Sequence, residues 1–322
     1  MNVMDNKVTL GRAGIKVTEL CFGTLTMSAL QADLSPESME PVFKRALELG
    51  INFYDTAHRY VTYRHLRVGL GQKINDVVIA SKTGAKTLEQ AREEVEQCFR
   101  ELGRDMIDIY LLHQVDDEAD LEQRRPVLDY LLKLQSQGKI RSVGLSSHRI
   151  SGNEVAIRHA DEMDILFPVI NQQGLGIIDG TVEQAMESLK RAKSAGLGIY
   201  AMKPLGGGHL RKNSVEAINF LRKSPLVDAI AIGIKSVDEV EVNVAIFSDG
   251  KFPLDQKKLE SLATTDRRTL VNFLCKRCGE CIKYCDQGAL FLGEKKAEVD
   301  LEKCILCGYC AAHCPQFAIR VI

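Results

Sequence analysis

The chain has 322 residues, of which 45% are hydrophobic and 26% are charged, a balance typical of a folded protein with one large core and a small second unit. Its 42 basic and 43 acidic residues leave a net charge of -1, which favours neither nucleic acid nor an anionic membrane as a partner. The sequence has no membrane-spanning apolar run and no signal peptide, so we expect a cytoplasmic protein.

Residues 19–250 alternate short β-branched apolar runs with amphipathic stretches of helical period, the pattern of repeated βαβ units. We expect eight strands, over Leu20–Leu25, Asn52–Thr56, Val77–Ser81, Ile107–His113, Ser142–Ser146, Ile165–Asn171, Gly198–Met202 and Ala229–Ile234. The helices between them include Pro36–Leu49, Leu88–Leu102, Pro126–Gln137, Thr181–Ala195 and Val215–Lys223.

Eight such units in about 230 residues predict an α/β fold of the closed (β/α)8 TIM barrel type. A doubly wound open sheet would more often carry a GxGxxG fingerprint after its first strand, and this chain has none there. Before the first strand, a hairpin of Val8–Leu10 and Ile15–Val17 is expected to close the barrel floor.

Four polar residues fall at or after the carboxyl ends of consecutive expected strands, where barrel enzymes place their active sites. Asp55 ends the second strand and Tyr60 follows five residues on, while Lys82 and His113 end the third and fourth strands. Each alone has an ordinary explanation, such as helix capping, packing or solvation. Together, an acid, a phenol, an amine and an imidazole around one mouth favour a catalytic site.

These residues resemble the catalytic tetrad of the aldo-keto reductase family, in which the Asp and the Tyr are also five apart. The resemblance covers roughly residues 5–250. It extends to the opening 8–12 and 22–24, to Gly144–Ser147, to Pro204–Gly206, and to Gly233–Ser236 with Asn243. It implies hydride transfer between a nicotinamide cofactor and a small carbonyl or alcohol substrate.

Hydride reduction of a carbonyl leaves an oxyanion that needs a proton from a group still protonated at neutral pH, and a phenol is such an acid. Tyr60 would supply this proton. Lys82 is expected to lower the pKa of Tyr60 by its charge, while Asp55 would hold Lys82 in an ion pair. His113 would donate a hydrogen bond to the carbonyl oxygen.

The resemblance also implies a set of cofactor-binding residues. Ser146 and Gln172 would bind the nicotinamide carboxamide, the backbone near Leu205 and Gly206 the pyrophosphate, and Lys235, Ser236, Glu239 and Asn243 the adenosine end. The three glycines from Gly206 are equally compatible with a flexible turn. Lys235 suits the 2′-phosphate of NADP, whereas Glu239 would suit the free ribose of NAD, so both cofactors stay open.

Two departures from the family pattern lie in this region. Family members commonly follow the tetrad tyrosine with glycine and an acidic Ser-Glu pair, whereas Val61 follows Tyr60 here. After Gln172 the chain continues Gln173-Gly174-Leu175-Gly176, with no aromatic residue to pack near a nicotinamide. The cofactor pocket is therefore expected to differ from that of the family.

Eight of the ten cysteines lie in the last 48 residues, while Cys21 and Cys98 are expected to be ordinary buried residues. A Cx2Cx2Cx3C run occurs twice, which is the spacing of bacterial two-cluster ferredoxins and more than paired zinc knuckles require. Asp286 stands where proline follows the fourth cysteine of such a run.

In such ferredoxins each run gives three ligands to one [4Fe-4S] cluster and its fourth ligand to the other. One cluster is therefore expected on Cys275, Cys278, Cys281 and Cys314, and the other on Cys304, Cys307, Cys310 and Cys285.

The expected organisation is a barrel over residues 1–250, a connector over 251–274 with a helix-like Leu254–Leu274, and a ferredoxin domain over 275–322. The predicted function is that of an aldo-keto reductase-type oxidoreductase. A cluster moves single electrons and a nicotinamide moves two, so a flavin at the barrel mouth is a further candidate cofactor if the clusters take part in turnover.

The alternative is an electron-transfer or redox-sensing protein whose barrel binds a nucleotide or flavin without carbonyl turnover. Basic pairs such as Lys276-Arg277 could dock an acidic electron-carrier protein, although we favour the simpler interpretation that they offset the charge of the clusters.

Overall fold

The computed structural model describes residues 3–264, 267–316 and 318–321. Eight parallel strands close into a barrel in the order β10-β3-β4-β5-β6-β7-β8-β9, which confirms the predicted fold class. The barrel strands are β3 Leu20–Gly23, β4 Phe53–Asp55, β5 Val78–Thr83, β6 Ile107–Leu112, β7 Ile140–Ser147, β8 Ile165–Pro168, β9 Gly198–Met202 and β10 Ala229–Gly233. Among the barrel strands, β8 ends three residues before its expected end, although Val169 beyond it still forms an isolated bridge with Met202.

Helices surround the barrel and bury their apolar faces against the outer sides of the strands. They are α1 Pro36–Glu48, α2 Tyr63–Leu70, α3 Leu88–Leu102, α4 Glu118–Gln123, α5 Arg125–Ser136, α6 Ile150–Arg158, α7 Val182–Ser194, α8 Ser214–Arg222 and α9 Val237–Phe247. Helix α3 shows how local sequence sets their ends. The Thr87 side chain accepts a hydrogen bond from the Gln90 N–H at its start, and Gly103 ends it with a φ of 63°.

The predicted hairpin closes the floor of the barrel. Strands β1 Lys7–Leu10 and β2 Ile15–Thr18 pair antiparallel. Their side chains Leu10, Ile15 and Val17 are fully buried in one cluster with interior residues of the barrel strands. This leaves the opposite end, where the strands have their carboxyl ends, as the functional end of the barrel.

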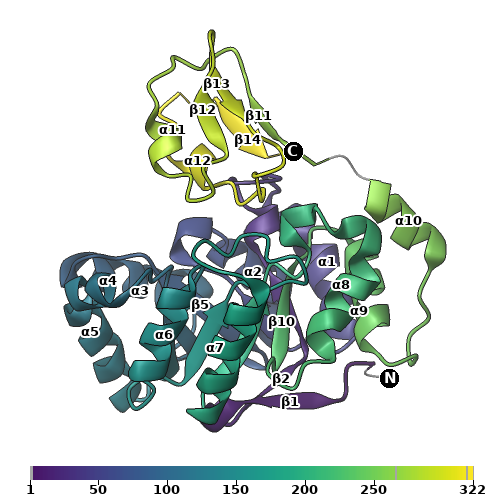
Figure 1. Cartoon of the computed structure of the whole chain (residues 1–322). Helices are drawn as coiled ribbons and strands as arrows, with labels where there is room; N and C mark the ends of the chain where they lie inside the picture. Colours follow the sequence, from purple (N-terminus) through teal and green to yellow (C-terminus); the bar gives the residue numbers. More distant parts are fainter. Residues whose placement is uncertain (1–2, 265–266, 317, 322) are drawn as a thin grey trace.

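A small C-terminal module sits over that end, opposite the β1–β2 hairpin (Figure 1). Strand β11 Thr269–Val271 pairs with β14 Ile319–Val321, and β12 Leu290–Leu292 pairs with β13 Ala297–Val299. Two short helices, α11 Glu280–Lys283 and α12 Tyr309–Ala312, complete it. Each cysteine run contains one of these helices, and one strand precedes and one follows each run, as expected of a duplicated two-cluster unit.

The expected helix over Leu254–Leu274 is wrong in its second half. The helix in this segment is α10 Gln256–Thr264, whereas residues 269–271 form strand β11. The reason is tertiary: Thr269-Leu270-Val271 finds a strand partner in the last residues of the chain. The C-terminal module therefore includes residues that precede its first cysteine.

Candidate active site and cluster sites

The Asp55–Lys82 ion pair lies buried at the barrel mouth, where β4 and β5 end. Lys82 Nζ donates hydrogen bonds of 2.7 Å to each carboxylate oxygen of Asp55 and to the Thr56 backbone oxygen. Tyr200 Oη donates another of 3.0 Å to Asp55. Burial raises the pKa of Asp55 and lowers that of Lys82, while the charge of each opposes the shift of the other. All three protons of the ammonium group are thus engaged.

Tyr60 and His113 meet beside this ion pair. Tyr60 ends a 3-10 turn after β4, and its ring stands edge-on to that of His113 with 5.6 Å between centroids. Lys82 Nζ lies over the face of the Tyr60 ring, 5.2 Å from its centroid. The structure therefore brings the four predicted tetrad residues together at one mouth.

The pKa of Tyr60 differs in direction from the sequence-based expectation. Burial, followed by the neighbouring Tyr309, raises the pKa of Tyr60 well above its ordinary value. The Lys82 ammonium lies over the ring of Tyr60 and donates its hydrogen bonds to Asp55 and Thr56. The cation that lowers the pKa of Tyr60 is Arg59. Burial, together with nearby cations, holds the pKa of His113 well below its ordinary value, so its imidazole is neutral.

Val61, which departs from the family pattern, occupies a backbone conformation that suits glycine. Its φ is 57°, in the left-handed region, which is rare for a β-branched residue. The side chain is 66% exposed and therefore meets little resistance from its surroundings. The family's usual glycine at this place would adopt the same turn without strain.

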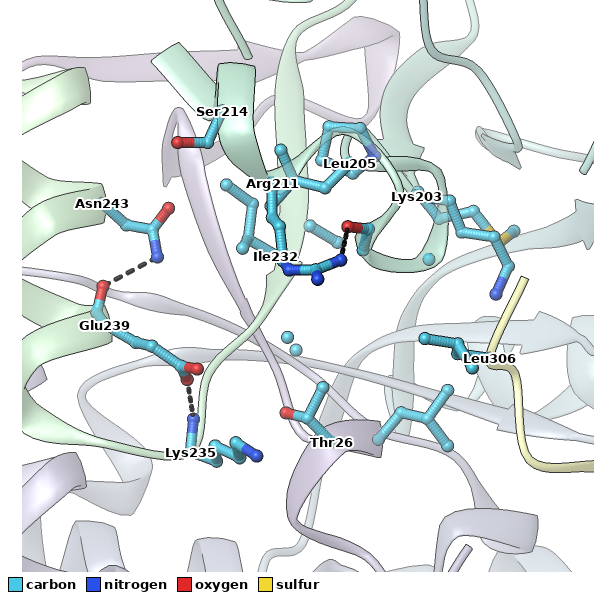
Figure 2. Close-up of a pocket in the computed structure, with 18 of the residues that line it drawn as sticks. Thr26, Lys203, Leu205, Arg211, Ser214, Ile232, Lys235, Glu239, Asn243 and Leu306 are labelled. Atoms are coloured by element: carbon cyan, nitrogen blue, oxygen red, sulfur yellow. Dashed lines mark hydrogen bonds between the residues drawn. The ribbon is translucent and has the colours of Figure 1, made fainter. Parts of the chain in front are cut away.

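A cavity of about 220 Å³ extends from the tetrad to α9. Thr26 Oγ1, Arg211 Nε and Arg267 Nε on its walls are buried polar atoms with no hydrogen-bond partner among the described residues. Arg211 reaches into the middle of the cavity, where another of its nitrogens donates to the Gly208 backbone oxygen (Figure 2). Unpartnered donors, two of them on cations, fit an anionic ligand such as a phosphate group.

Four of the eight predicted cofactor-binding residues line this cavity, namely Leu205, Lys235, Glu239 and Asn243. Glu239 accepts a hydrogen bond of 2.6 Å from the Lys235 backbone N–H, and Asn243 donates one of 2.7 Å to the Glu239 backbone oxygen (Figure 2). Burial raises the pKa of Glu239, whereas Lys235 and Arg267 act to lower it. The Glu239 carboxylate thus secures the turn that precedes α9.

The other four predicted residues lie outside the cavity wall, as far as the described residues define it. Ser236 caps α9 by accepting from the Glu239 N–H. Ser146 Oγ accepts a hydrogen bond of 2.9 Å from the Gln114 N–H, so its role in this structure is to hold the turn after β6. Gly206 and Gln172 complete the set.

Four cysteines from both runs surround one small cavity in the C-terminal module, which we call the inner cluster site. They are Cys285, Cys304, Cys307 and Cys310. The Ala289 N–H donates to Cys285 Sγ at 3.3 Å, and Thr269 Oγ1 lies 3.2 Å from Cys304 Sγ. Hydrogen bonds to the sulfurs suit cluster-bound thiolates, so these residues fit a [4Fe-4S] cluster.

The remaining four cysteines of the two runs form what we call the outer cluster site, made of Cys275, Cys278, Cys281 and Cys314. Burial raises the pKa of Cys281, and the nearby thiols of Cys314, Cys275 and Cys278 act in the same direction. Backbone N–H groups of Ala297 and Ala318 donate to Cys275 and Cys314, each at 3.3 Å. The geometry supports the crossed grouping that the spacing predicts.

The C-terminal module is joined to the barrel mouth by polar contacts that begin at the inner cluster site. Its Asp286, which stands where proline is usual, accepts a hydrogen bond from Gln114, a residue that follows β6. Besides the contact between Tyr309 and His113, polar contacts run from Gln31 Nε2 to Leu306 O at 3.0 Å, between His209 Nε2 and Cys304 O at 2.6 Å, and from Gln114 Nε2 to Asp286 Oδ2 at 2.5 Å.

Several residues of the site escaped prediction. Tyr200 lies within a strand, where its sequence context is that of an ordinary core aromatic residue. Nothing in the sequence distinguishes Arg211 and Arg267 from the many charged residues expected on the surface. Tyr309 contacts the tetrad from another module. The only signal for Arg59 is its position next to Tyr60.

Comparison with known proteins agrees with this architecture. Residues 19–225 match the aldo/keto reductase family, and residues 274–318 match the 4Fe-4S dicluster domain. The chain is 24% identical to the uncharacterized oxidoreductase YrpG of Bacillus subtilis, covering 74% of this chain and 81% of that protein. It is 22% identical to L-galactose dehydrogenase of Arabidopsis thaliana, covering 79% and 92%.

A solved aldo-keto reductase from Bacillus halodurans superposes with a TM-score of 0.63 at 20% identity, over 81% of this chain and 97% of that one. The barrel is thus an oxidoreductase barrel, and the module on its mouth is of the two-cluster ferredoxin type. The chain belongs to the aldo/keto reductase family. Among the described residues, no helix is long and apolar enough to cross a membrane.

The two cluster sites predict the metal content. Protein purified without air is expected to contain about eight iron and eight sulfide per chain, as two [4Fe-4S] clusters require. Chemical iron and sulfide assays, with electron paramagnetic resonance after dithionite reduction, measure this. A colourless protein that carries zinc and takes up no iron on anaerobic reconstitution would contradict the assignment.

Proposed function

We propose that the chain transfers hydride between a nicotinamide dinucleotide and a small carbonyl or alcohol substrate. The observation that supports this most is that Asp55, Lys82, Tyr60 and His113 lie together beside a cavity. The walls of that cavity carry hydrogen-bond donors that have no partner among the described residues and suit a phosphate group. The nicotinamide supplies or accepts the hydride when it is bound. The overall reaction converts a carbonyl, a reduced nicotinamide and one proton into an alcohol and the oxidised nicotinamide.

In this proposal Tyr60 gives its phenolic proton to the substrate oxygen as the oxyanion forms. The raised pKa of Tyr60 keeps the phenol protonated until that moment. His113, being neutral, donates a hydrogen bond to the same oxygen and orients it. The Asp55–Lys82 pair holds the Lys82 ammonium over the face of the Tyr60 ring and so fixes that ring beside His113.

The direct test is carbonyl-dependent oxidation of NADPH or NADH by the anaerobically purified chain. We expect a rate that rises with aldehyde concentration and saturates. Nucleotide binding without any turnover across short and aromatic aldehydes, assayed in both directions with the matching alcohols, would contradict the proposal.

For the cofactor we propose NADP. Four basic residues line the cavity, namely Lys203, Arg211, Lys235 and Arg267, against two carboxylates. The Asp55 carboxylate is engaged with Lys82, and that of Glu239 with the Lys235 backbone. A cavity with this excess of positive charge favours the ligand that carries an extra phosphate.

Replacing Arg267 by alanine is accordingly expected to weaken NADPH binding by roughly tenfold, since a hydrogen bond to a charged group contributes about 1.5–3 kcal/mol and neighbouring cations compensate in part. Nucleotide fluorescence measures the dissociation constants of NADPH and NADH. Arg64→Ala, which removes an exposed arginine paired with Glu37 on the barrel surface, is the control and should change neither constant. Equal binding by parent and Arg267→Ala would remove Arg267 from the cofactor site.

A second candidate function is electron exchange between the clusters and a ligand in the barrel cavity. Ile305, Tyr309 and His148 line both this cavity and the inner cluster site, so one layer of side chains separates the two. Because a nicotinamide moves two electrons together, a flavin in the cavity would be the natural intermediary, and an electron-carrier protein the outer partner. Anaerobic titration with NADPH, with and without added FMN, followed by electron paramagnetic resonance tests this. Cluster reduction in flavin-free protein would exclude the flavin requirement.

A further inference from the structure

Tyr309 of the C-terminal module reaches into the tetrad. Its hydroxyl oxygen lies 3.4 Å from His113 Nε2, and a hydrogen bond between Tyr309 and Tyr60 raises the pKa of Tyr60. The Tyr309 ring also stacks on the His148 ring at 6.4 Å between centroids, and the Arg59 guanidinium lies 5.4 Å from its centroid. Tyr309 itself is 6% exposed. A second module therefore contributes a buried hydroxyl to the centre of the barrel's site.

The loop 304–310 that carries Tyr309 is seated closely on the barrel mouth. Gly207, with a φ of 72°, lies so near Ile305 that a Cβ on it would stand 1.9 Å from the Ile305 backbone oxygen. On the other side, Gly308 has a φ of 79° and a Cβ there would stand 2.5 Å from the Leu30 backbone oxygen. Glycine on both surfaces allows backbone to meet backbone, which indicates a fitted contact.

The position of the Tyr309 hydroxyl conflicts with the chemistry proposed above. Tyr60 and His113 are the two groups that would contact the oxygen of a carbonyl substrate, and the Tyr309 oxygen already contacts both. A hydroxyl oxygen accepts hydrogen bonds as a carbonyl oxygen does. A carbonyl group and the Tyr309 hydroxyl therefore compete for one place.

We infer that Tyr309 holds the place of the substrate's carbonyl oxygen, so that the C-terminal module closes the active site and a carbonyl enters only when loop 304–310 withdraws. This inference rests on the proposed function for the identity of the ligand. Tyr309 then determines which substrates reach the tetrad, and its displacement lowers the apparent affinity for each of them. The apparent affinity is reduced by the fraction of molecules in which the loop is withdrawn.

The inner cluster is placed to control this closure. Tyr309 lies between Cys307 and Cys310, two ligands of the inner cluster site, while none of the outer ligands falls within the seated loop. The conformation of the loop therefore depends on the inner cluster, because metal ligation fixes the backbone that carries the ligands. Loss of the inner cluster should free Tyr309, whereas loss of the outer cluster should leave it seated.

The first test removes the hydroxyl or the whole ring. Tyr309→Phe deletes the contacts with Tyr60 and His113, and we expect the dissociation constant of acetate, an unreactive oxygen ligand, to fall roughly 3- to 10-fold by anaerobic calorimetry. The gain should vanish in the double variant Tyr309→Phe/Tyr60→Phe, because it acts through the Tyr60 hydroxyl. Tyr309→Ala should raise kcat/KM for an aromatic aldehyde by roughly tenfold or more. Phe291→Ala, which truncates a half-exposed aromatic on β12, is the matched control and should change neither quantity.

The second test separates the clusters. Cys285→Ser removes an inner ligand and Cys278→Ser an outer one, and iron analysis verifies which cluster each variant retains. We expect faster hydrogen exchange across loop 304–310 and tighter acetate binding in Cys285→Ser, with parental values in Cys278→Ser. Equal behaviour of the two variants would overturn the link to the inner cluster.

The outcomes separate this inference from the proposed function. Turnover in the parent that is unaffected by Tyr309→Phe and Tyr309→Ala, with unchanged acetate binding, would overturn the inference and leave the function standing. No turnover in any variant, with tighter acetate binding in Tyr309→Phe, would support the closure and refute carbonyl reduction.

Discussion

Tyr60→Phe is expected to lower kcat for carbonyl reduction by roughly 10²–10⁴-fold, the usual contribution of a positioned general acid. Phenylalanine keeps the ring between the Lys82 ammonium and the His113 imidazole, so the packing at the mouth survives. The dissociation constant for the dinucleotide should change little, because the proton is needed only as the oxyanion forms. Steady-state kinetics and nucleotide fluorescence measure the two quantities separately.

Tyr63→Phe is the matched control for this experiment. Tyr63 is buried three residues further along the chain, yet its hydroxyl lies 2.9 Å from Ser81 Oγ among core residues, away from the cavity. The loss of that hydrogen bond should lower the free energy of unfolding by about 1 kcal/mol and leave kcat unchanged. A Tyr60→Phe variant as fast as the parent would show that Tyr60 is not the proton donor.

The barrel was predictable from the sequence because its elements are local. Each βα unit carries its own apolar period and end signals, such as Thr87 at the start of α3 and Gly103 after it. The cysteine grouping was predicted from the two-cluster ferredoxin pattern, and the cavity lined by Cys285, Cys304, Cys307 and Cys310 agrees with its inner half. The segment 269–271 escaped because its strand character depends on a partner some fifty residues away in the chain.

Within the candidate site, the tetrad was predictable because strand ends in a barrel share one edge. What the sequence could not supply is the docking of one module on another. Tyr309 is an unremarkable residue between two cysteines until the loop that carries it is placed beside His113. The prediction that the pKa of Tyr60 is lowered was wrong for the same reason. That pKa depends on burial beneath the loop and on the direction of the Lys82 hydrogen bonds.

These findings change the role expected of Lys82. Its ammonium group was expected to act on the Tyr60 hydroxyl, but it is bound by Asp55 and Thr56 with no proton left to donate. The ion pair therefore acts as a fixed unit at the floor of the site. A buried charge that depends on one partner makes that partner critical to stability as well as to chemistry.

Asp55→Ala is accordingly expected to lower the free energy of unfolding by roughly 3–5 kcal/mol, because it leaves the buried Lys82 ammonium without a counter-charge. The Lys82 side chain is fully buried and that of Asp55 is 5% exposed, so water cannot replace the lost carboxylate without opening the mouth. Anaerobic urea unfolding, followed by the far-UV signal of the barrel, measures the change.

Two comparisons give this result its meaning. Glu37→Ala breaks an ion pair with Arg64 of nearly the same length, 2.8 Å, whose side chains are 59% and 70% exposed, and it should cost only about 0–1 kcal/mol. The double variant Asp55→Asn/Lys82→Met removes both buried charges and should recover much of the stability lost in Asp55→Ala. If Asp55→Ala were no less stable than Glu37→Ala, the Asp55 carboxylate would not be what holds a charged Lys82 in the folded protein.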